Sequence, residues 1–552
     1  MPTIEVSMKS LEKLSGRRLR EEDLELAKGK IEEINAGKAR IEIGDTNRPD
    51  LWCAEGIARV VKGKRFQKLP AKSSGKEIIV DRKILSIRPF ISGFAAKNIM
   101  VDEELLLDMI QLQDKLGENF GKKRKKISVG IYNYDMIKFP VHYKAVNPSY
   151  RFVPLGFDKP ATLKDILSEH PKGRDYGYIL QNHKLYPLLV DLKDEVLSFP
   201  PIINSNYLGK VSAGLRNVMV EVTGTEQKSV LLAANIFAYS LFERGAHIES
   251  IISRYPVATK FGKSVQSPYD FSEKMSFGRQ KIRDILGIDL KEHEIKSLLE
   301  RMQYGVSFSG NAVNVAIPPY RNDIMHHADV IEDIAIAYGY ENFNELGIDS
   351  FTAGSLKGAT IFSEKSRRIM TGLGFQEIMS AILSSKNCVC EKMNAESSPI
   401  EIENAMSENY SCIRNWVLPN ILQCLSKNMH VEFPQKIFEL GECVLTDRKS
   451  DDGTSTITKM AGAISGNDAG YEDISSCADA FLDGLGFKYR IKTSCHPSFI
   501  EGRCGGIYVK EKLAGVVGEV HPKVLNNWRI EKPVAAFEAD ISFLMKAATS
   551  QA

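Results

Sequence analysis

Four carboxylates lie close together in the segment from Pro318 to Phe343, which holds the residues best suited to chemistry. They are Asp323, Asp329, Glu332 and Asp333. On a helix, residues three and four apart share one face, so the last three would lie side by side. Like charges repel at that spacing, and a hard divalent cation is the natural group to face them. The pattern therefore predicts a cation site.

Other interpretations of this segment stay open. The acids could form a solvated face that pairs with Arg321 and nearby lysines. His326 and His327 could join the carboxylates as transition-metal ligands. An independent metal-dependent hydrolase is a weaker interpretation, because no nucleophile or general base clusters near the acids.

The whole chain has 552 residues and a net charge of +3, so several domains are expected and no partner class is excluded by charge. The nine cysteines are odd in number and scattered, which is typical of reduced thiols. Cys388 and Cys390 form a close pair without a second pair or a nearby histidine, a weak zinc signal. No signal peptide or membrane span is evident, and we expect a cytoplasmic protein without membrane contact.

The elements that must position these residues predict an α+β multidomain protein. We expect an N-terminal mixed module over 1–77, a mixed α+β domain over 78–265 and a winged-helix-like, metal-binding domain over 266–345. The region 346–552 is expected to form an antiparallel sheet flanked by helices. Residues 70–77 have linker composition. Strict alternation predicts a strand over 218–224, and a helix is expected over 229–242.

A turn at 47–50 precedes a helical pattern near the start of the chain. Asp50 is expected to cap that helix and Arg48 to pair locally with Asp50. We assign this turn a structural role.

The order and wording of these segments resemble the β subunit of phenylalanyl-tRNA synthetase, in its shorter archaeal and eukaryotic form. The resemblance covers essentially the whole chain. It rests on NRPDLWCAEGIARVVKG, RPFISGFAAKN, SVGIYNYDMIK, SNYLGKVSAGLRNVMVEVTGTE, PPYRNDI with ADVIEDIAIAYGYENF, VLPNILQCLSKNMHVEFPQKIFELGECV and GVVGEVHPKVLNNW.

The resemblance implies an enzyme that attaches phenylalanine to tRNA(Phe) as an α2β2 heterotetramer. It places ATP and the aminoacylation site on the α subunit. It implies a Mg2+ site with Asp323, Asp329, Glu332 and Asp333 as ligands. The C-terminal domain is then class II synthetase-like but catalytically silent, because PQKIFELGECV and GVVGEVHPKVLNNW lack the arginines that would stabilise phosphate charge.

The resemblance also makes 78–265 an editing domain that hydrolyses mischarged Tyr-tRNA. Its implied catalytic residues are Asn206, Ser212, Glu221, Thr223 and Thr225. On a strand, Glu221 and Thr223 face the same way, with the neighbouring valines toward the core. Related chains carry Asp where this chain has Glu221. No Ser-His-Asp or Cys-His set is visible, so we predict hydrolysis by a positioned water; an ordinary strand end with polar turn residues is the alternative.

A basic run at Lys122–Lys126 could contact tRNA phosphates or form a solvated loop. A different class of function, a free-standing binding or regulatory protein built from synthetase-like parts, also stays open. Co-purification with a catalytic chain would separate it from a synthetase subunit.

Overall fold

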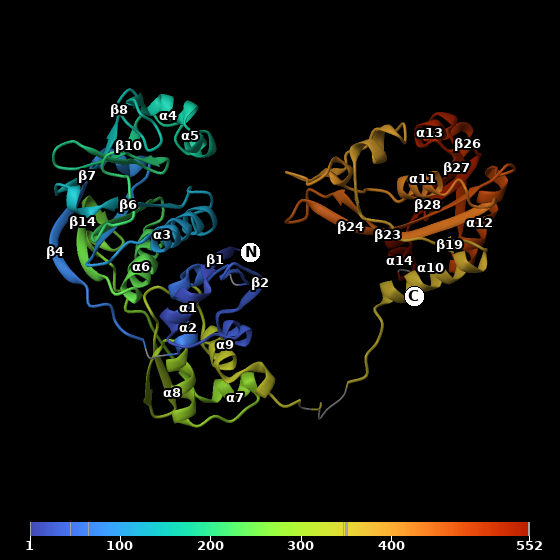
Figure 1. The fold of residues 1–552 in the computed structure, drawn as a ribbon. Helices are drawn as coiled ribbons and strands as arrows, with labels where there is room; N and C mark the ends of the chain where they lie inside the picture. Colours follow the sequence, from blue (N-terminus) through green and yellow to red (C-terminus); the bar gives the residue numbers. More distant parts are fainter. Residues whose placement is uncertain (1, 45, 64–65, 346, 348–351, 550–552) are drawn as a thin grey trace. The chain divides into compact units, whose positions relative to one another are not determined.

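The computed structural model describes residues 2–44, 46–63, 66–345, 347 and 352–549, and Figure 1 shows the fold. The chain forms two compact units, Met1–Leu346 and Gly347–Ala552. Both mix helices and strands, as the sequence predicts for an α+β multidomain protein.

The largest element of the first unit is a 10-stranded mixed sheet. Its strands follow the order β12-β11-β10-β7-β4-β14-β5-β13-β6, and β15 pairs with β14. Their bounds are β4 Lys72–Val80, β5 Phe90–Lys97, β6 Ile127–Asn133, β7 Val141–Val146, β10 Tyr186–Val190, β11 Val196–Phe199, β12 Ile203–Asn204, β13 Val218–Gly224, β14 His247–Thr259 and β15 Gly262–Ser267. The expected linker at 70–77 is wrong: most of it belongs to β4, whose backbone pairs in parallel with β14 and β7.

The strand predicted over 218–224 is β13, which lies between β5 and β6. Val220 and Val222 are fully buried in the main core. Helix α6, Gln227–Glu243, packs on β5 and β13 and also contacts helix α2, Ala54–Lys62. Because it is covered on several sides, α6 is apolar around most of its circumference.

Further helices border this sheet. Helix α3, Glu103–Lys115, contacts β6 and continues into a short π-helical turn at Leu116–Phe120. The region between β7 and β10 carries the small pair β8 Arg151–Phe152 and β9 Ala161–Thr162 with helices α4 Leu163–Glu169 and α5 Pro171–Tyr176.

The N-terminal module has a three-stranded sheet and two helices. Its elements are β1 Thr3–Ser7, α1 Met8–Ser15, β2 Gly29–Asn35, β3 Lys38–Ile43 and α2. The predicted Arg48–Asp50 pair is confirmed, with nitrogen–oxygen distances of 2.9 and 2.8 Å between two buried side chains. The capping role of Asp50 is wrong, because α2 begins at Ala54 and its N-cap residue is Cys53.

The segment from 274 to 338 has the two helices, hairpin and third helix expected of a winged-helix-like unit. A further strand, β16, also pairs with the hairpin strand β18. The elements are β16 Lys274–Gly278, α7 Gln280–Leu286, α8 Glu292–Arg301, β17 Gly305–Ser309, β18 Ala312–Ala316 and α9 His327–Tyr338.

The second unit is built on a 7-stranded sheet in the order β19-β23-β24-β28-β27-β26-β25. All neighbours are antiparallel except β19 and β23. The strands are β19 Gln376–Glu377, β23 Gln435–Thr446, β24 Thr454–Ser465, β25 Tyr489–Thr493, β26 Phe499–Val509, β27 Lys512–Val520 and β28 Val534–Asp540. The helices are α10 Gly358–Gly372, α11 Leu418–Lys427, α12 Tyr471–Leu485, α13 Pro522–Trp528 and α14 Ile541–Thr549. A small sheet holds β20 Leu383–Ser384, β21 Ile400–Glu401 and β22 Cys412–Ile413.

Over the described residues of both units, every helix is too short or too polar to cross a membrane.

Candidate functional site

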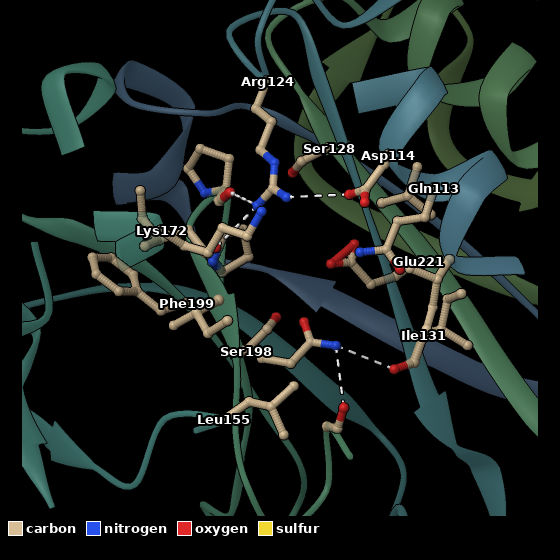
Figure 2. Close-up of a pocket in the computed structure, with 18 of the residues that line it drawn as sticks. Gln113, Asp114, Arg124, Ser128, Ile131, Leu155, Lys172, Ser198, Phe199 and Glu221 are labelled. Carbon is tan, nitrogen blue, oxygen red and sulfur yellow. Dashed lines mark hydrogen bonds and ion pairs between the residues drawn. The ribbon is translucent and has the colours of Figure 1, made fainter. Parts of the chain in front are cut away.

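A cavity of about 250 Å³ lies between the large sheet, α3 and the segment 198–211. Its apolar wall comes from several elements and includes Leu106, Ile110, Ile131, Leu155 and Phe199. Figure 2 shows the polar side chains that enter it, among them Ser128, Ser198 and Glu221. A mostly apolar cavity with a few convergent polar groups is the usual form of a small-molecule site.

Glu221 is a residue of this cavity wall whose carboxylate has an unused bonding position. It lies on β13 opposite Gly93 on one side and Gly130 on the other. Its Oε1 accepts a hydrogen bond from the Tyr132 hydroxyl at 3.0 Å. Its Oε2 is buried and has no hydrogen-bond partner in the structure. A buried carboxylate oxygen without a donor is costly, so this atom is suited to accept a hydrogen bond from a ligand.

The environment of Glu221 also changes its protonation. Burial raises the pKa of its carboxyl to about 7, while the Tyr132 hydroxyl and the Arg88 guanidinium act in the opposite direction. Gly130 leaves the room for this arrangement, because a Cβ there would meet both the Tyr132 ring hydroxyl and the Glu221 carboxylate.

Hydroxyl groups connect Glu221 to the wall of the cavity. The Tyr132 hydroxyl lies 2.8 Å from Ser198 Oγ as well as 3.0 Å from Glu221. The Asn204 amide donates to the carbonyl oxygens of Ile131 and Gly209, which fixes its position on the wall. The polar side of the cavity is thus held by bonds within the protein, while Glu221 Oε2 has no partner there.

Thr223 lies behind the cavity and does not line it. Its Oγ1 accepts a hydrogen bond from Arg88 Nε at 3.0 Å and lies 3.0 Å from Ser128 Oγ. Ser128 does line the cavity. Arg88 is itself buried, and desolvation lowers its pKa to about 10. Thr223 therefore positions Ser128.

The structure separates the five residues predicted for hydrolysis. Glu221 and Thr223 face the same side of β13, as predicted. Asn206, Ser212 and Thr225 are not among the residues that line the cavity, and their predicted catalytic role stays a prediction. Ser212 and Thr225 are exposed, and the Thr225 hydroxyl donates a hydrogen bond to the carbonyl of Lys125.

Sequence reasoning missed Ser128, Tyr132 and Ser198. Ser128 and Tyr132 lie on β6, and they reach Thr223 and Glu221 because β6 pairs with β13. No local signal in the sequence indicated which strand would be the neighbour of β13.

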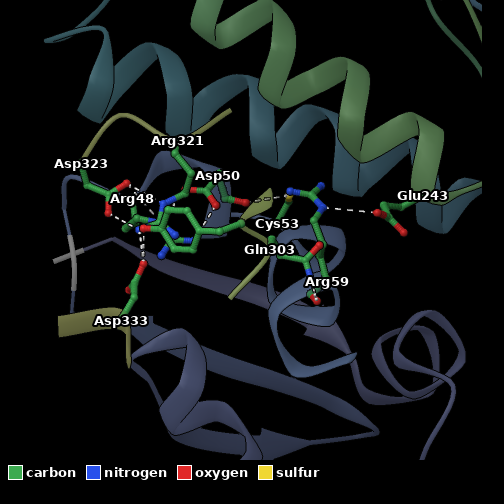
Figure 3. Close-up of polar contacts among 10 residues, drawn as sticks. Arg48, Asp50, Cys53, Arg59, Glu243, Gln303, Arg321, Asp323 and Asp333 are labelled. Atoms are coloured by element: carbon green, nitrogen blue, oxygen red, sulfur yellow. Dashed lines mark hydrogen bonds and ion pairs between the residues drawn. The ribbon is translucent and has the colours of Figure 1, made fainter. Parts of the chain in front are cut away.

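The acidic segment forms a buried ion cluster that includes two of the four predicted ligands (Figure 3). The Arg321 guanidinium lies 2.5 Å from Asp323 and 2.8 Å from Asp333. Arg48 lies 3.7 Å from Asp323. The Tyr304 hydroxyl donates to Asp333 at 2.6 Å. Burial acts to raise the pKa of Asp323, but Arg321 and Arg48 outweigh it, and the pKa is lowered.

The other two predicted ligands have different partners. Asp329 accepts hydrogen bonds from the backbone nitrogens of Met325 and His326 and so takes part in capping the N-terminus of α9. Glu332 pairs with Lys28 of the N-terminal module at 2.8 Å. Each carboxylate is therefore matched to a donor of its own chain.

The four carboxylates consequently do not converge on one point, and the predicted four-ligand set does not fit this arrangement. Across the ranges that the structure describes, no group of three or more His, Cys, Asp or Glu could hold a metal ion, which covers Cys388 and Cys390 and the His326–His327 pair as well. The interpretation that pairs these acids with Arg321 and a lysine matches the contacts, although Asp323 and Asp333 are largely buried. Magnesium binding by the assembled protein stays a prediction.

In the second unit, charged side chains buried on the sheet pair with one another. Arg414 lies 2.7 Å from Glu439 of β23, with both side chains 3% exposed. Glu538 of β28 accepts from the backbone nitrogens of Val417 and Leu418 and pairs with Lys459. These groups stabilise the packing of α11 on the sheet.

Two family models identify the class of protein. Residues 275–340 match the tRNA synthetase B5 domain, and residues 348–541 match the phenylalanyl tRNA synthetase beta chain CLM domain. The chain is thus built from modules of an aminoacyl-tRNA synthetase.

Relatives over the full length identify the family. The phenylalanine–tRNA ligase beta subunit of Pyrococcus horikoshii is 38% identical over 552 residues, 98% of each chain. That of Borreliella afzelii is 37% identical, over 93% of this chain and 92% of its own. The crystal structure of an N-terminal fragment of the Pyrococcus horikoshii phenylalanyl-tRNA synthetase β-subunit superposes with a TM-score of 0.59 at 38% identity, covering 61% of this chain and all of the fragment. The chain belongs to the phenylalanine–tRNA ligase β-subunit family.

Proposed function

We propose that the site beside Glu221 hydrolyses the ester bond of tyrosine that has been wrongly attached to tRNA(Phe). An α subunit performs the ATP-dependent attachment of phenylalanine to the same tRNA. The observation that carries the proposal is the buried Oε2 atom of Glu221, which has no hydrogen-bond partner, on a residue that lines the cavity. A tyrosine side chain would place its hydroxyl there, and a phenylalanine side chain would leave the carboxylate unsatisfied.

The need for such a site is chemical. A pocket that binds phenylalanine rejects tyrosine weakly, because tyrosine adds only a hydroxyl. A second site that hydrogen-bonds the hydroxyl favours tyrosine strongly over phenylalanine, because bound phenylalanine would leave a buried polar group of the site unpaired. Glu221 supplies that group, and Ser198 and Tyr132 hold it in place.

Hydrolysis then uses water. No histidine or cysteine is found among the described residues that line the cavity, so no conventional acyl-enzyme nucleophile–base pair is present there. The water oxygen adds to the ester carbonyl carbon and the bond from that carbon to the ribose oxygen breaks. A proton of the water passes to the ribose oxygen, so the products are free tyrosine and a ribose hydroxyl. The contribution of the chain is orientation: tyrosine is bound by its hydroxyl, and its ester lies at the mouth of the cavity.

Replacing Glu221 or Thr223 with alanine tests this function. In a complex co-expressed with the α subunit, both variants should release tyrosine from mischarged tRNA more slowly and still attach phenylalanine. Thr225→Ala is the matched control, because Thr225 lies on the same stretch of chain but outside the cavity. Tyrosine release that is unaffected in both Glu221→Ala and Thr223→Ala would reject the assignment.

The partner and cofactors follow from the family. We propose an α2β2 assembly that uses ATP bound on the α subunit and magnesium. The second unit carries exposed apolar side chains near its small sheet, including Met379, Leu383, Met406 and Tyr410, which suit an interface. Isolation from the native source should recover an α chain in equal amount; a stable, active monomer would contradict the assembly.

A further inference from the structure

The basic run Lys122–Lys126 adopts an unusual backbone next to the cavity. Lys122, Lys123 and Arg124 all have positive φ, at 50°, 52° and 61°. Non-glycine residues rarely adopt this left-handed conformation, and three in succession need support from the surroundings. We call residues 122–126 the basic turn.

Hydrogen bonds from both sides hold the basic turn. The nitrogens of Lys123 and Arg124 donate to Glu118 and Gly117 at 2.8 Å each. The buried Arg88 donates to the carbonyls of Arg124 and Lys125. The same Arg88 binds Thr223, so the basic turn and the polar wall of the cavity share one support.

The basic turn divides its side chains between the cavity and solvent. Arg124 lines the cavity and donates to the carbonyls of Pro201 and Ile202 at 3.1 and 3.0 Å (Figure 2). Asp114 and Glu118 face Arg124 at 3.6 and 3.9 Å and offset its charge. Lys126 pairs with Glu226 at 2.5 Å. Arg124 and Lys126 are therefore committed to the protein.

Lys122 and Lys123 are exposed instead. Within the part of the chain that the structure describes, neither forms an ion pair within 4 Å. Two such lysines held on a rigid turn are suited to bind phosphates.

An aromatic side chain lies against the same turn. Tyr178 is 38% exposed, and its hydroxyl donates to the carbonyl of Lys123 at 3.3 Å. The Lys125 ammonium lies 5.1 Å from its ring centroid. A partly exposed ring beside exposed cations is the combination by which proteins bind single-stranded nucleic acids, with bases stacked on the ring and phosphates on the lysines.

The size of the cavity indicates which part of the substrate lies here. At about 250 Å³ it suits one amino acid rather than an aminoacyl nucleotide. The nucleotides that carry the ester must then lie outside it, along its rim.

We propose that the basic turn and Tyr178 bind the unpaired 3′ strand of the aminoacylated RNA, with phosphates on Lys122 and Lys123 and a base on Tyr178. This inference rests on the proposed hydrolytic function. It makes these residues positioning residues: they hold the RNA so that its ester reaches the cavity, and they do not touch the reacting atoms.

The test uses the αβ complex and Tyr-tRNA, with KM and kcat for tyrosine release measured across salt concentrations. K122N/K123N removes both charges, and asparagine tolerates positive φ. We expect KM to rise roughly 10- to 100-fold with kcat within about twofold, and the slope of log KM against log salt to fall by about 1.4, as expected for two lost contacts to a single strand. Tyr178→Ala should raise KM roughly 5- to 100-fold by loss of one stacked base.

The control is K9Q/K13Q, which removes two exposed lysines from α1 and should change neither value. Unchanged KM and salt slope in K122N/K123N would overturn the inference, and so would equal changes in the control variant. The inference would also be overturned if polyglutamate competed with Tyr-tRNA as well as RNA does. The two proposals fail separately. Absence of tyrosine release by the unaltered complex rejects the hydrolytic function, and binding of an uncharged RNA hairpin ending in a single-stranded 3′ strand then tests the basic turn alone.

Discussion

Replacing Glu221 with glutamine should change how the stability of the first unit depends on pH. Burial raises the pKa of the Glu221 carboxyl from 4.5 to about 7. Between these values the folded state keeps a proton that the unfolded chain has released, so the free energy of unfolding falls as pH rises from 4.5 through about 7. Because one pKa unit corresponds to about 1.4 kcal/mol, the fall attributable to this carboxyl is about 3 kcal/mol.

Glutamine has nearly the same shape and does not titrate. The stability of Glu221→Gln relative to the unaltered chain should therefore improve by about 3 kcal/mol between pH 4.5 and 8, with the change centred below pH 7. The substitution also replaces one of the two carboxylate oxygens with an NH2 group, which leaves fewer acceptors for the tyrosine hydroxyl, the usual conflict between stability and function at a binding site.

Urea unfolding of a fragment spanning 2–345, at half-unit pH steps from 4.5 to 8.5, measures this difference. The fragment is suited to unfolding experiments because residues 2–345 belong to one compact unit. An N-terminal fragment of the Pyrococcus horikoshii relative has also been crystallised by itself. Glu195→Gln, in the exposed turn after β10, is the matched control and should give a difference that is small and independent of pH. A constant difference for Glu221→Gln, or one that grows toward acid pH, would refute the reasoning.

Two predictions concern the acidic segment. Arg321→Met leaves the buried Asp323 and Asp333 without their shared cation, and the free energy of unfolding should fall by about 3 to 5 kcal/mol. Arg254→Met breaks an exposed pair with Glu77 and should cost less than about 1 kcal/mol; equal losses in urea unfolding would contradict a buried ion cluster. Asp329→Ala removes the acceptor at the start of α9 and should lower stability by about 0.5 to 2 kcal/mol and weaken subunit assembly. Tyrosine release per folded complex should stay unchanged, and a selective loss of that activity would count against this role.

Local patterns in the sequence predicted the elements that frame the site. The strand at 218–224, the shared face of Glu221 and Thr223, and the helices and hairpin before α9 all follow from periods of two and 3.6 residues. The linker expected at 70–77 failed because its polar composition hid a strand that is stabilised mainly by backbone pairing with β14 and β7.

The sequence alone was enough to determine the family, the order of the modules and the two stretches of chain where chemistry was expected. Periodicity and sequence motifs depend only on residues that are close together in the chain, so both can be recognised without knowing the tertiary structure. Tertiary structure was needed to place Tyr132 and Ser198 beside Glu221, because strand neighbours come from distant parts of the chain. It also supplied the cations of the acidic segment: Arg48 and Lys28 reach it from the N-terminal module and form ion pairs with Asp323 and Glu332.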